Sequence, residues 1–400
     1  MQETSIKPKE QKKLYIATLD PYNKGGVLAM ISFVYSKAVE SRFAPYLIYN
    51  LILSLRKDFD RSHISKGVLK ENFNNMRGIA IKRRWLVFEF LNYILNLYSW
   101  KKAIRDGDIF FAASGSNHCA LPFALLNKKF SVWVATPIYE DRINKIKKES
   151  FLRKLRDFLS LPILLYLEHF IFKKATRILA LSVYTRNKII EKYGINPAKI
   201  AVVPYPIDVN KFYPIDYSQR KDNYLLFTGR INDERKNIPL LLTSFSKARS
   251  KYPDLKLILI GEQPNKKLLE LIDALNISNS VKILGQLSQM EELLPYYQNA
   301  SLFVVPSFQE GLCISALESL ACGIPIISTR CGGTEDFVRD GSNGFLVKNN
   351  DPEELSRKII EFLDFDTDRK RKFSNNARNY IVRHYSPENI WQKFLECFDL

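Results

Sequence analysis

Short, mainly apolar runs alternate with helically spaced runs along the second half of the chain. The runs Tyr224–Thr228 and Leu302–Val305 are continuous and rich in β-formers, which is typical of buried parallel strands. Helical spacing follows them, for example at Pro239–Lys251 and Ile314–Ala321. The pattern predicts six strands alternating with helices, which is a doubly wound α/β domain.

The first half carries the same alternation. Leu14–Leu19 predicts a first strand, a loop with Gly25-Gly26 follows, and helical spacing resumes at Val27. A glycine turn between a strand and a helix is the usual opening of a doubly wound domain. Further strands of this half are predicted at 108–113, 131–135, 178–181 and 200–203.

Proline punctuates the stretch between the halves, at Pro204, Pro206 and Pro214. Few helices or central strands tolerate such a composition, so we expect a linker here. Near the end, Ser386-Pro387-Glu388 has the form of a helix cap followed by a first turn. The predicted organisation is a first domain at 1–213, a linker within 204–221, a second domain at 222–385 and a terminal helix at 386–400.

Charge divides the chain unevenly. Residues 1–220 hold 37 Lys and Arg against 18 Asp and Glu, a net charge of +19, whereas residues 221–400 carry −1. A basic half beside a neutral half indicates a polyanionic partner for the first half only. An anionic membrane and a nucleic acid are the two candidates.

Cysteine and histidine give no sign of a metal site. The five cysteines form no Cys-x-x-Cys pair and the four histidines match no ligand spacing, so we expect no metal and a reducing, cytoplasmic location. The N-terminal residues 1–13 are charged and lack the apolar core of a signal peptide. No apolar run approaches the roughly 20 residues of a spanning helix, so the chain is not expected to cross a membrane.

The most specific motif lies where the strand Leu302–Val305 meets the next helix. Glu310 would sit at the turn and Glu318 two turns later, about 12 Å along a helix axis. That separation suits two hydrogen-bond acceptors along a polyhydroxyl ligand rather than one metal. Gly311 and the amides of 312–314 would form a helix N-terminus that favours an anion. The motif thus indicates a nucleotide-sugar, although two solvated glutamates on a surface helix would give the same letters.

A second motif follows the first strand of this domain. Gly229-Arg230 ends the strand and Lys236 comes six residues later. A planar guanidinium and a point-charge ammonium in one β-α loop suit a diphosphate. Solvated basic residues are the alternative explanation.

These residues give the chain a resemblance to a known family: it resembles a retaining family-4 glycosyltransferase of the GT-B fold (glycosyl transferases group 1). The resemblance is strong over 224–360 and weaker but collinear over 14–213. The motifs that carry it occur in order along the chain: Gly25-Gly26, Pro204 with Asp208, Gly229-Arg230 with Lys236, Gly261-Glu262, Leu284-Gly285, Glu310-Gly311 to Glu318, Ala321 to Pro325, Gly332-Gly333 with Glu335, and Asn343-Gly344.

The resemblance implies a fold and a set of roles. It implies two Rossmann-like domains facing across a cleft, with a C-terminal helix returning to the first domain, where Trp391 and Phe394 would dock. Arg230 and Lys236 would hold the donor diphosphate and stabilise the departing nucleotide, Glu318 would bind the ribose, and Glu310 would contact the sugar. Catalysis is thereby assigned to Glu310, Arg230 and Lys236. Further donor-binding positions would be Gly25, Gly26, Gly229, Gly285, Gly311, Leu312 and Cys313. The family is typically metal-independent, and no cofactor besides the nucleotide-sugar is expected.

The first domain departs from the family pattern. Members often carry a histidine after the strand that here ends at Ala135, where this chain has Thr136 or Pro137. His118 lies one loop earlier and could still reach the cleft, or it could be a loop histidine with no chemical role. Thr136 and His118 are therefore only possible cleft residues.

The predicted activity is retaining, hexosyltransferase-type transfer from a UDP- or GDP-sugar to a glycan or lipid-linked acceptor, in cell-surface polysaccharide or glycolipid synthesis. A soluble transferase with a small sugar or sugar-phosphate acceptor is the alternative. A non-catalytic nucleic-acid-binding protein is a remote alternative, because no nucleic-acid-binding motif in the sequence supports it.

Two segments predict a peripheral position on the inner face of the cell membrane. Residues 80–102 and 142–174 combine basic clusters with apolar and aromatic residues, as interfacial helices do. They would equally suit ordinary helices of the first domain with solvated charges.

Overall fold

The structure is a computed structural model, and it describes residues 11–19, 26–51, 68–82, 88–104, 109–140, 151–220, 223–287 and 289–398, with the side chains of 26 and 151–159 left aside. Contacts divide the chain into two compact units. The first holds the residues up to Leu181, Thr185–Val203 and the end of the chain from Trp391; the second holds Ser182–Tyr184 and Pro204–Ile390.

The first unit is built on an eight-stranded sheet of order β3-β4-β2-β1-β5-β6-β7-β8. All neighbouring strands are parallel except β3 and β4, which are antiparallel. Its strands are β1 (Lys13–Ala17), β2 (Ala44–Leu51), β3 (Val68–Phe73), β4 (Met76–Lys82), β5 (Ile109–Ser114), β6 (Phe130–Val134), β7 (Arg177–Ala180) and β8 (Ile200–Val202). Its helices are α1 (Gly26–Glu40), α2 (Glu89–Leu95), α3 (Leu97–Ala103), α4 (Leu121–Leu125), α6 (Phe151–Lys174) and α7 (Val183–Tyr193).

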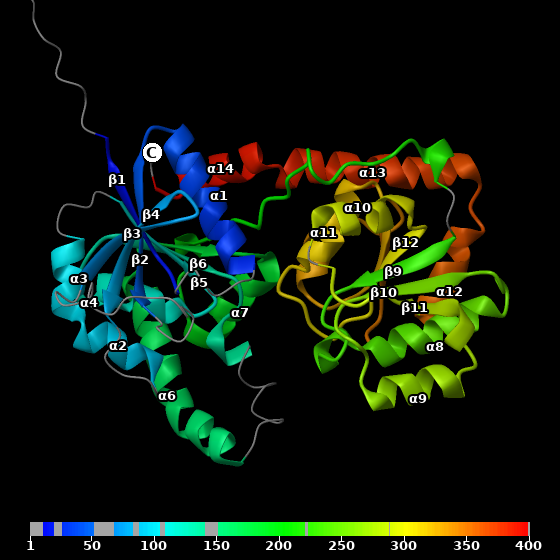
Figure 1. The fold of residues 1–400 in the computed structure, drawn as a ribbon, viewed down its shortest axis with the longest axis horizontal. Helices are drawn as coiled ribbons and strands as arrows, with labels where there is room; N and C mark the ends of the chain where they lie inside the picture. The colour runs from blue at the N-terminus through cyan, green and yellow to red at the C-terminus, as the bar shows by residue number, and fades with distance from the viewer. Residues whose placement is uncertain are drawn as a thin grey trace, which may run out of the picture. The chain divides into compact units, whose positions relative to one another are not determined.

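The C-terminal helix α14 (Pro387–Glu396) lies beside α1 in Figure 1. Trp391 meets Phe33 edge to face, and its indole nitrogen donates to the Ser41 hydroxyl at 2.9 Å. Phe394 packs edge to face on Phe111 of β5, with ring centroids 4.9 Å apart. The expected return of the last helix to the first domain is confirmed, because these buried aromatic rings have their partners there.

The second unit contains a six-stranded parallel sheet of order β11-β10-β9-β12-β13-β14. Its strands are β9 (Tyr224–Thr228), β10 (Lys256–Ile260), β11 (Val281–Ile283), β12 (Leu302–Val305), β13 (Ile326–Thr329) and β14 (Gly344–Val347). Its helices are α8 (Ile238–Arg249), α9 (Lys266–Ala274), α10 (Met290–Asn299), α11 (Ile314–Ala321), α12 (Pro352–Leu363) and α13 (Thr367–Tyr385). The doubly wound fold predicted for this half is confirmed, since β9 and β12 are buried along their whole length.

The order of this second sheet reverses between β9 and β12. The chain steps outward from β9 through β10 to β11, then returns to add β12 on the other side of β9. Such a reversal leaves a crevice at the carboxyl ends of the two central strands, where ligands of open α/β sheets bind. The residues that follow β9 and β12 are those singled out from the sequence.

Three first-unit strands lie where none was predicted. β2, β3 and β4 occupy 44–51, 68–73 and 76–82, and Asn74 and Asn75 turn the β3-β4 hairpin with φ of 46° and 64°. A two-residue turn with positive φ at both positions is a recognised hairpin signal. The strand β3 has the sequence VLKENF. Because this edge strand is only partly buried, it contains polar residues, and the apolar pattern did not reveal it.

The segment 80–102 is not one amphipathic element, which corrects that expectation. Residues 80–82 end β4, residues 83–87 lie outside the described residues, and the helices α2 and α3 begin only at Glu89 and Leu97. Phe90, Tyr93 and Trp100 are buried in the core of the first unit, so these aromatic rings do not face a lipid surface. Of the second segment, 141–150 lie outside the described residues and 151–174 form α6.

The first unit also ends earlier than the predicted boundary at 213. The backbone of 204–213 belongs to the second unit: Ile207 N donates to the Tyr385 carbonyl at 2.8 Å, and Arg378 donates to the carbonyls of Val209 and Phe212. The proline-rich segment is thus held by α13. Among the described helices, none is long and apolar enough to cross a bilayer.

Candidate active site

Two loops of the second unit meet at the reversal point of its sheet. One follows β9 and contains Arg230 and Lys236; the other follows β12 and contains Glu310. The backbone nitrogen of Phe308 donates to the Arg235 carbonyl at 2.7 Å, which ties the two loops together. Residues more than 70 positions apart in sequence are therefore neighbours.

Lys236 and Glu310 form an ion pair in this place. Lys236 Nζ lies 2.7 Å from Glu310 Oε1, and the Ser307 hydroxyl donates to the same oxygen at 2.6 Å. The two side chains are only 15% and 10% exposed. Burial lowers the pKa of Lys236, but the Glu310 carboxylate outweighs it and the pKa is raised overall, so the ammonium stays charged. Both residues were expected to contact the donor, but their direct pairing was not predicted.

Arg230 is held by Asp233, which no sequence motif indicated. Asp233 Oδ2 lies 2.9 Å from both Arg230 Nη2 and Arg235 Nη2. Burial raises the pKa of Asp233, yet the hydrogen bond and charge of Arg235, with the charge of Arg230, bring it down to about 2. The Arg230 side chain is 62% exposed, so its guanidinium keeps donors for a ligand.

Glycines bring three strand ends close together. A Cβ on Gly261 would lie 2.0 Å from the Gly229 carbonyl oxygen, so the two loops approach more closely than any side chain allows. Gly261 N donates to the Gly285 carbonyl at 3.0 Å. Glu262 accepts from the backbone nitrogen of Asn232 at 2.8 Å and braces the loop after β9. Gly229, Gly261 and Gly285 thus mark the ends of β9, β10 and β11.

The turn from Glu310 into α11 is shaped by backbone contacts. Glu310 N donates to the Cys331 carbonyl at 2.8 Å, and Gly333 N donates to the Glu310 carbonyl at 2.9 Å. A Cβ on Gly333 would meet the Gly311 carbonyl oxygen at 2.2 Å. Cys313 takes a left-handed conformation, φ 63°, as the cap of α11. Its thiol is buried, and burial raises its pKa to about 12, so Cys313 can offer a ligand its backbone but no thiolate.

Glu318 is partly exposed on α11 and bonded to a tyrosine. The Tyr297 hydroxyl donates to Glu318 Oε2 at 2.8 Å and lies 3.0 Å from Thr228 Oγ1 at the end of β9. Burial raises the pKa of Glu318 to about 7 against the effect of that hydrogen bond. Tyr297 was not predicted, because nothing in the sequence of α10 indicates that this helix reaches Glu318.

One buried donor beside Lys236 has no partner. Asn237 adopts φ 48° and is only 6% exposed, and its amide Nδ2 forms no hydrogen bond within the described residues. Leaving a buried donor unpaired costs about 1–3 kcal/mol. A ligand acceptor at this point would satisfy it.

The first-unit candidates are placed differently. Gly25 lies outside the described residues, Gly26 is the first residue of α1, and Thr136 lies in the bend after β6. His118 is 2% exposed; its Nδ1 lies 3.2 Å from Ser116 Oγ and its Nε2 lies 3.2 Å from the Leu164 carbonyl. The ring is thus bonded inside the core. The described residues contain no group of three or more His, Cys, Asp or Glu that could hold a metal.

Two doubly wound domains, the second with paired charges at its reversal point, define the GT-B type of glycosyltransferase fold. A solved structure of Anabaena Alr3699/HepE in complex with UDP has the same fold, with a TM-score of 0.73 at 16% identity over 97% of this chain and all of that one.

Comparison of sequences agrees. The model "Glycosyl transferases group 1" matches residues 214–380, and the model "Glycosyltransferase Family 4" matches residues 55–211. The chain therefore belongs to this family of group 1, family 4 glycosyltransferases.

Curated relatives match over part of their length. A D-inositol 3-phosphate glycosyltransferase of Corynebacterium urealyticum is 31% identical over 52% of this chain and 53% of its own. An N,N'-diacetylbacillosaminyl-diphospho-undecaprenol alpha-1,3-N-acetylgalactosaminyltransferase of Campylobacter jejuni is 29% identical over 52% of this chain and 56% of its own. The chain thus spans about half the length of these relatives.

Proposed function

We propose that the protein transfers a sugar from a UDP- or GDP-sugar to a glycan or lipid-linked acceptor, with retention of anomeric configuration. The observation that carries the proposal is the Lys236–Glu310 pair beside Arg230, at the reversal point of the second sheet. Two similar proteins support this class of substrates: the Anabaena protein of the same fold that was solved in complex with UDP, and the Campylobacter jejuni relative whose name includes a diphospho-undecaprenol acceptor.

Two cations would stabilise the leaving group. Lys236 has three donors, of which Glu310 takes one, and Arg230 exposes most of its guanidinium. As the glycosidic bond breaks, negative charge grows on the diphosphate, and these preorganised cations would stabilise it most in the transition state. The reaction as proposed needs no metal, since two cations can neutralise the departing diphosphate.

The two glutamates would contact two other parts of the donor, the sugar and the ribose. Glu310, fixed by Ser307 and Lys236, would contact the sugar, while the amides of Gly311, Leu312 and Cys313 lie next to it in sequence. Glu318, which keeps acceptor capacity beyond its bond to Tyr297, would accept from the ribose hydroxyls. The unpaired Asn237 amide would supply one more donor to the nucleotide-sugar.

Calorimetric titration of UDP and GDP tests the donor assignment. Lys236→Ala should weaken the better-bound nucleotide by about 1.5–3 kcal/mol, the value of a hydrogen bond to a charged group. The matched control is Lys266→Gln, whose lysine is 90% exposed on α9. Equal affinities in wild type and Lys236→Ala would contradict the assignment.

Glu310→Gln tests the sugar contact separately. The variant should bind nucleotide as the wild type does and lose turnover, because a contact that strengthens only in the transition state acts on rate. Wild-type transfer rates in Glu310→Gln would refute the role of Glu310. Retention is read from the anomeric configuration of the product by NMR.

The acceptor is proposed to lie at the cytoplasmic face of an anionic membrane, with the first unit in contact with it. That unit exposes large apolar side chains on α3 and α6: Tyr98 is 81% exposed, Tyr166 70% and Ile163 48%. The excess of +19 in residues 1–220 adds attraction to anionic lipid, about 1 kcal/mol for each basic residue near the surface.

Sedimentation with anionic and neutral liposomes tests this placement. Binding should need anionic lipid, weaken with salt and fall in Tyr166→Ser with Ile163→Ser. The matched control is Leu269→Ser, which removes an apolar side chain 44% exposed on the second unit. Failure to bind anionic vesicles at low salt would favour the small-acceptor alternative.

A further inference from the structure

A polar cavity lies within the second unit, at the opposite end of its sheet from the candidate active site. Its volume is about 150 Å³. Asn223, Ser301 and Pro325 line it, and each directly precedes a strand: β9, β12 and β13. The cavity therefore opens at the amino ends of the strands, whereas Lys236 and Glu310 lie at the carboxyl ends.

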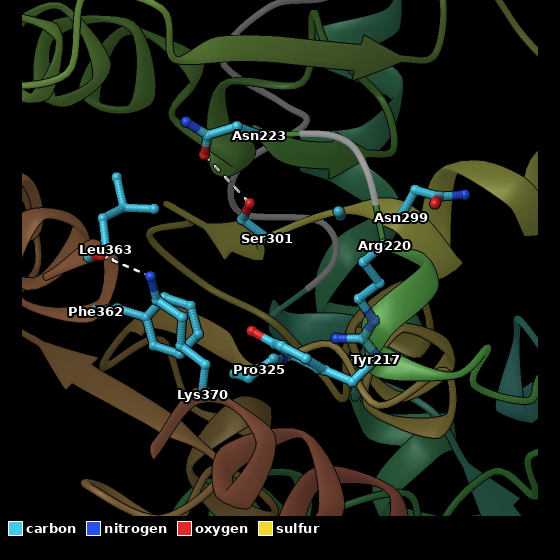
Figure 2. A pocket seen from close by; sticks show the side chains of 10 residues that line it. Tyr217, Arg220, Asn223, Asn299, Ser301, Pro325, Phe362, Leu363 and Lys370 are labelled. Carbon is cyan, nitrogen blue, oxygen red and sulfur yellow. Dashed lines mark hydrogen bonds between the residues drawn. The ribbon is translucent and has the colours of Figure 1, made fainter. Parts of the chain in front are cut away.

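The side walls of this cavity carry two cations. Figure 2 shows Tyr217 and Arg220 on one side, with Phe362, Leu363 and Lys370 on the other. The Arg220 guanidinium stacks on the Tyr217 ring, 4.9 Å from its centroid. Positive charge thus faces the cavity from both sides.

Arg220 is a half-buried cation that no carboxylate neutralises among the described residues. Its Nη2 donates to the carbonyls of Cys322 and Gly323 and to Ser374 Oγ, at 3.1–3.3 Å. Its Nε is buried and has no hydrogen-bond partner there. Burial lowers the pKa of Arg220, which reflects the cost of keeping this charge away from water. An anion would remove that cost.

Lys370 repeats the situation on the opposite wall. Its ammonium donates to the Leu363 carbonyl at 2.7 Å, and burial lowers its pKa against the charges of Asp364 and Asp366. Asp364 is itself paired with Lys251 at 2.7 Å, so it does not neutralise Lys370 alone. Lys370 keeps two further N–H donors beyond the one bonded to Leu363.

We propose that this cavity binds a small phosphate-type oxyanion, free or as a compact phosphomonoester, between Arg220 and Lys370. A planar guanidinium and a mobile ammonium are the side chains that recognise phosphate best. The size agrees, because a cavity of about 150 Å³ accepts a molecule of roughly six heavy atoms and phosphate has about five. A whole nucleotide is too large, which separates this site from the donor site.

The helix α11 connects this cavity with the candidate active site. Arg220 holds the carbonyls of Cys322 and Gly323, which directly follow α11, and α11 carries Glu318. An anion on Arg220 would therefore act on the C-terminal end of the helix that presents Glu318. We expect phosphate to stabilise the protein against heat and urea.

Binding of inorganic phosphate and glycerol phosphate tests the proposal, by calorimetry at constant ionic strength set with sodium chloride. The measurement uses the full chain carrying Lys236→Ala, so that the candidate active site does not contribute. Lys370→Gln should then bind at least about tenfold more weakly. Tyr217→Phe keeps the ring under Arg220 and should change affinity less. Lys266→Gln is the matched control and should bind as its parent does.

Each outcome decides the question. Tighter binding of glycerol phosphate than of phosphate supports an ester ligand, and the reverse supports the free anion; both support the site. Absence of binding, or equal binding with and without Lys370→Gln, overturns it. Binding by the wild type that disappears with Lys236→Ala also overturns it, because the anion would then belong to the candidate active site.

Discussion

Two glutamates in different units share a raised pKa but differ in their exposure and in the number of donors that bind their carboxylates. Burial raises the pKa of Glu168 on α6 and of Glu318 on α11 to about 7 in both cases. Glu168 is fully buried and accepts from Asn117 Nδ2 at 2.6 Å, the Ile138 backbone nitrogen at 3.1 Å and the Tyr193 hydroxyl. Glu318 is partly exposed and accepts from Tyr297.

The comparison separates a structural carboxylate from one that can receive a ligand. The oxygens of Glu168 are occupied by three donors from three elements of the first unit, so the group joins α6 to its neighbours. Glu318 keeps acceptor capacity next to a strand end. A perturbed pKa alone does not distinguish the two, whereas the number of donors and the exposure do.

Glu168→Ala should have the largest effect on stability. It leaves three donors unpaired in the core, and each costs about 1–3 kcal/mol, so we expect a loss of about 3 kcal/mol or more. The urea midpoint measures it. Glu318→Ala removes one partner of the buried Tyr297 hydroxyl, which still lies 3.0 Å from Thr228 Oγ1, and should cost about 1 kcal/mol. A larger cost than that of Glu168→Ala would break the comparison.

Glu318→Gln should have the next largest effect, on binding. An amide accepts less strongly from the ribose hydroxyls than a carboxylate, and the nucleotide should bind about 1.5–3 kcal/mol more weakly. Calorimetry with UDP and GDP measures the change, and the urea midpoint serves as the control. An unchanged affinity would place the ribose elsewhere.

Nucleotide affinity should rise with pH if Glu318 binds the ribose. The free protein holds a proton on Glu318 below its pKa of about 7, and hydroxyl donors favour the ionised form. Binding therefore lowers this pKa and releases a proton, so affinity rises with pH below about pH 7, at most about tenfold as the pH rises by one, and levels off above that value. Titration in buffers of different ionisation enthalpy measures the proton, and Glu318→Gln should release none.

Tyr297→Phe should have the smallest effect. It removes the donor to Glu318 while the buried ring stays in place, and a single hydrogen bond contributes about 0.5–1.5 kcal/mol. Nucleotide affinity should change by no more than this, while Glu318→Gln changes it further. A larger loss in Tyr297→Phe would mean that the tyrosine positions Glu318 rather than merely assisting it.

Local patterns in the sequence predicted much of the second unit. β9, β12 and α11 lie at the predicted residues, since their apolar periodicity and glycine turns act within a few positions. The first unit was harder. β3 is a polar edge strand and α2 and α3 break the apolar segment 80–102, so that periodicity alone did not reveal their boundaries.

What the sequence determined by itself is the local frame of the site: a strand, a turn at Glu310 and a helix carrying Glu318, and a basic loop after β9. Only the tertiary structure decided which of these groups meet. Sheet order makes β9 and β12 neighbours and so pairs Lys236 with Glu310, and α10 brings Tyr297 to Glu318. Strand order depends on packing and burial summed over the whole unit, which no stretch of neighbouring residues contains.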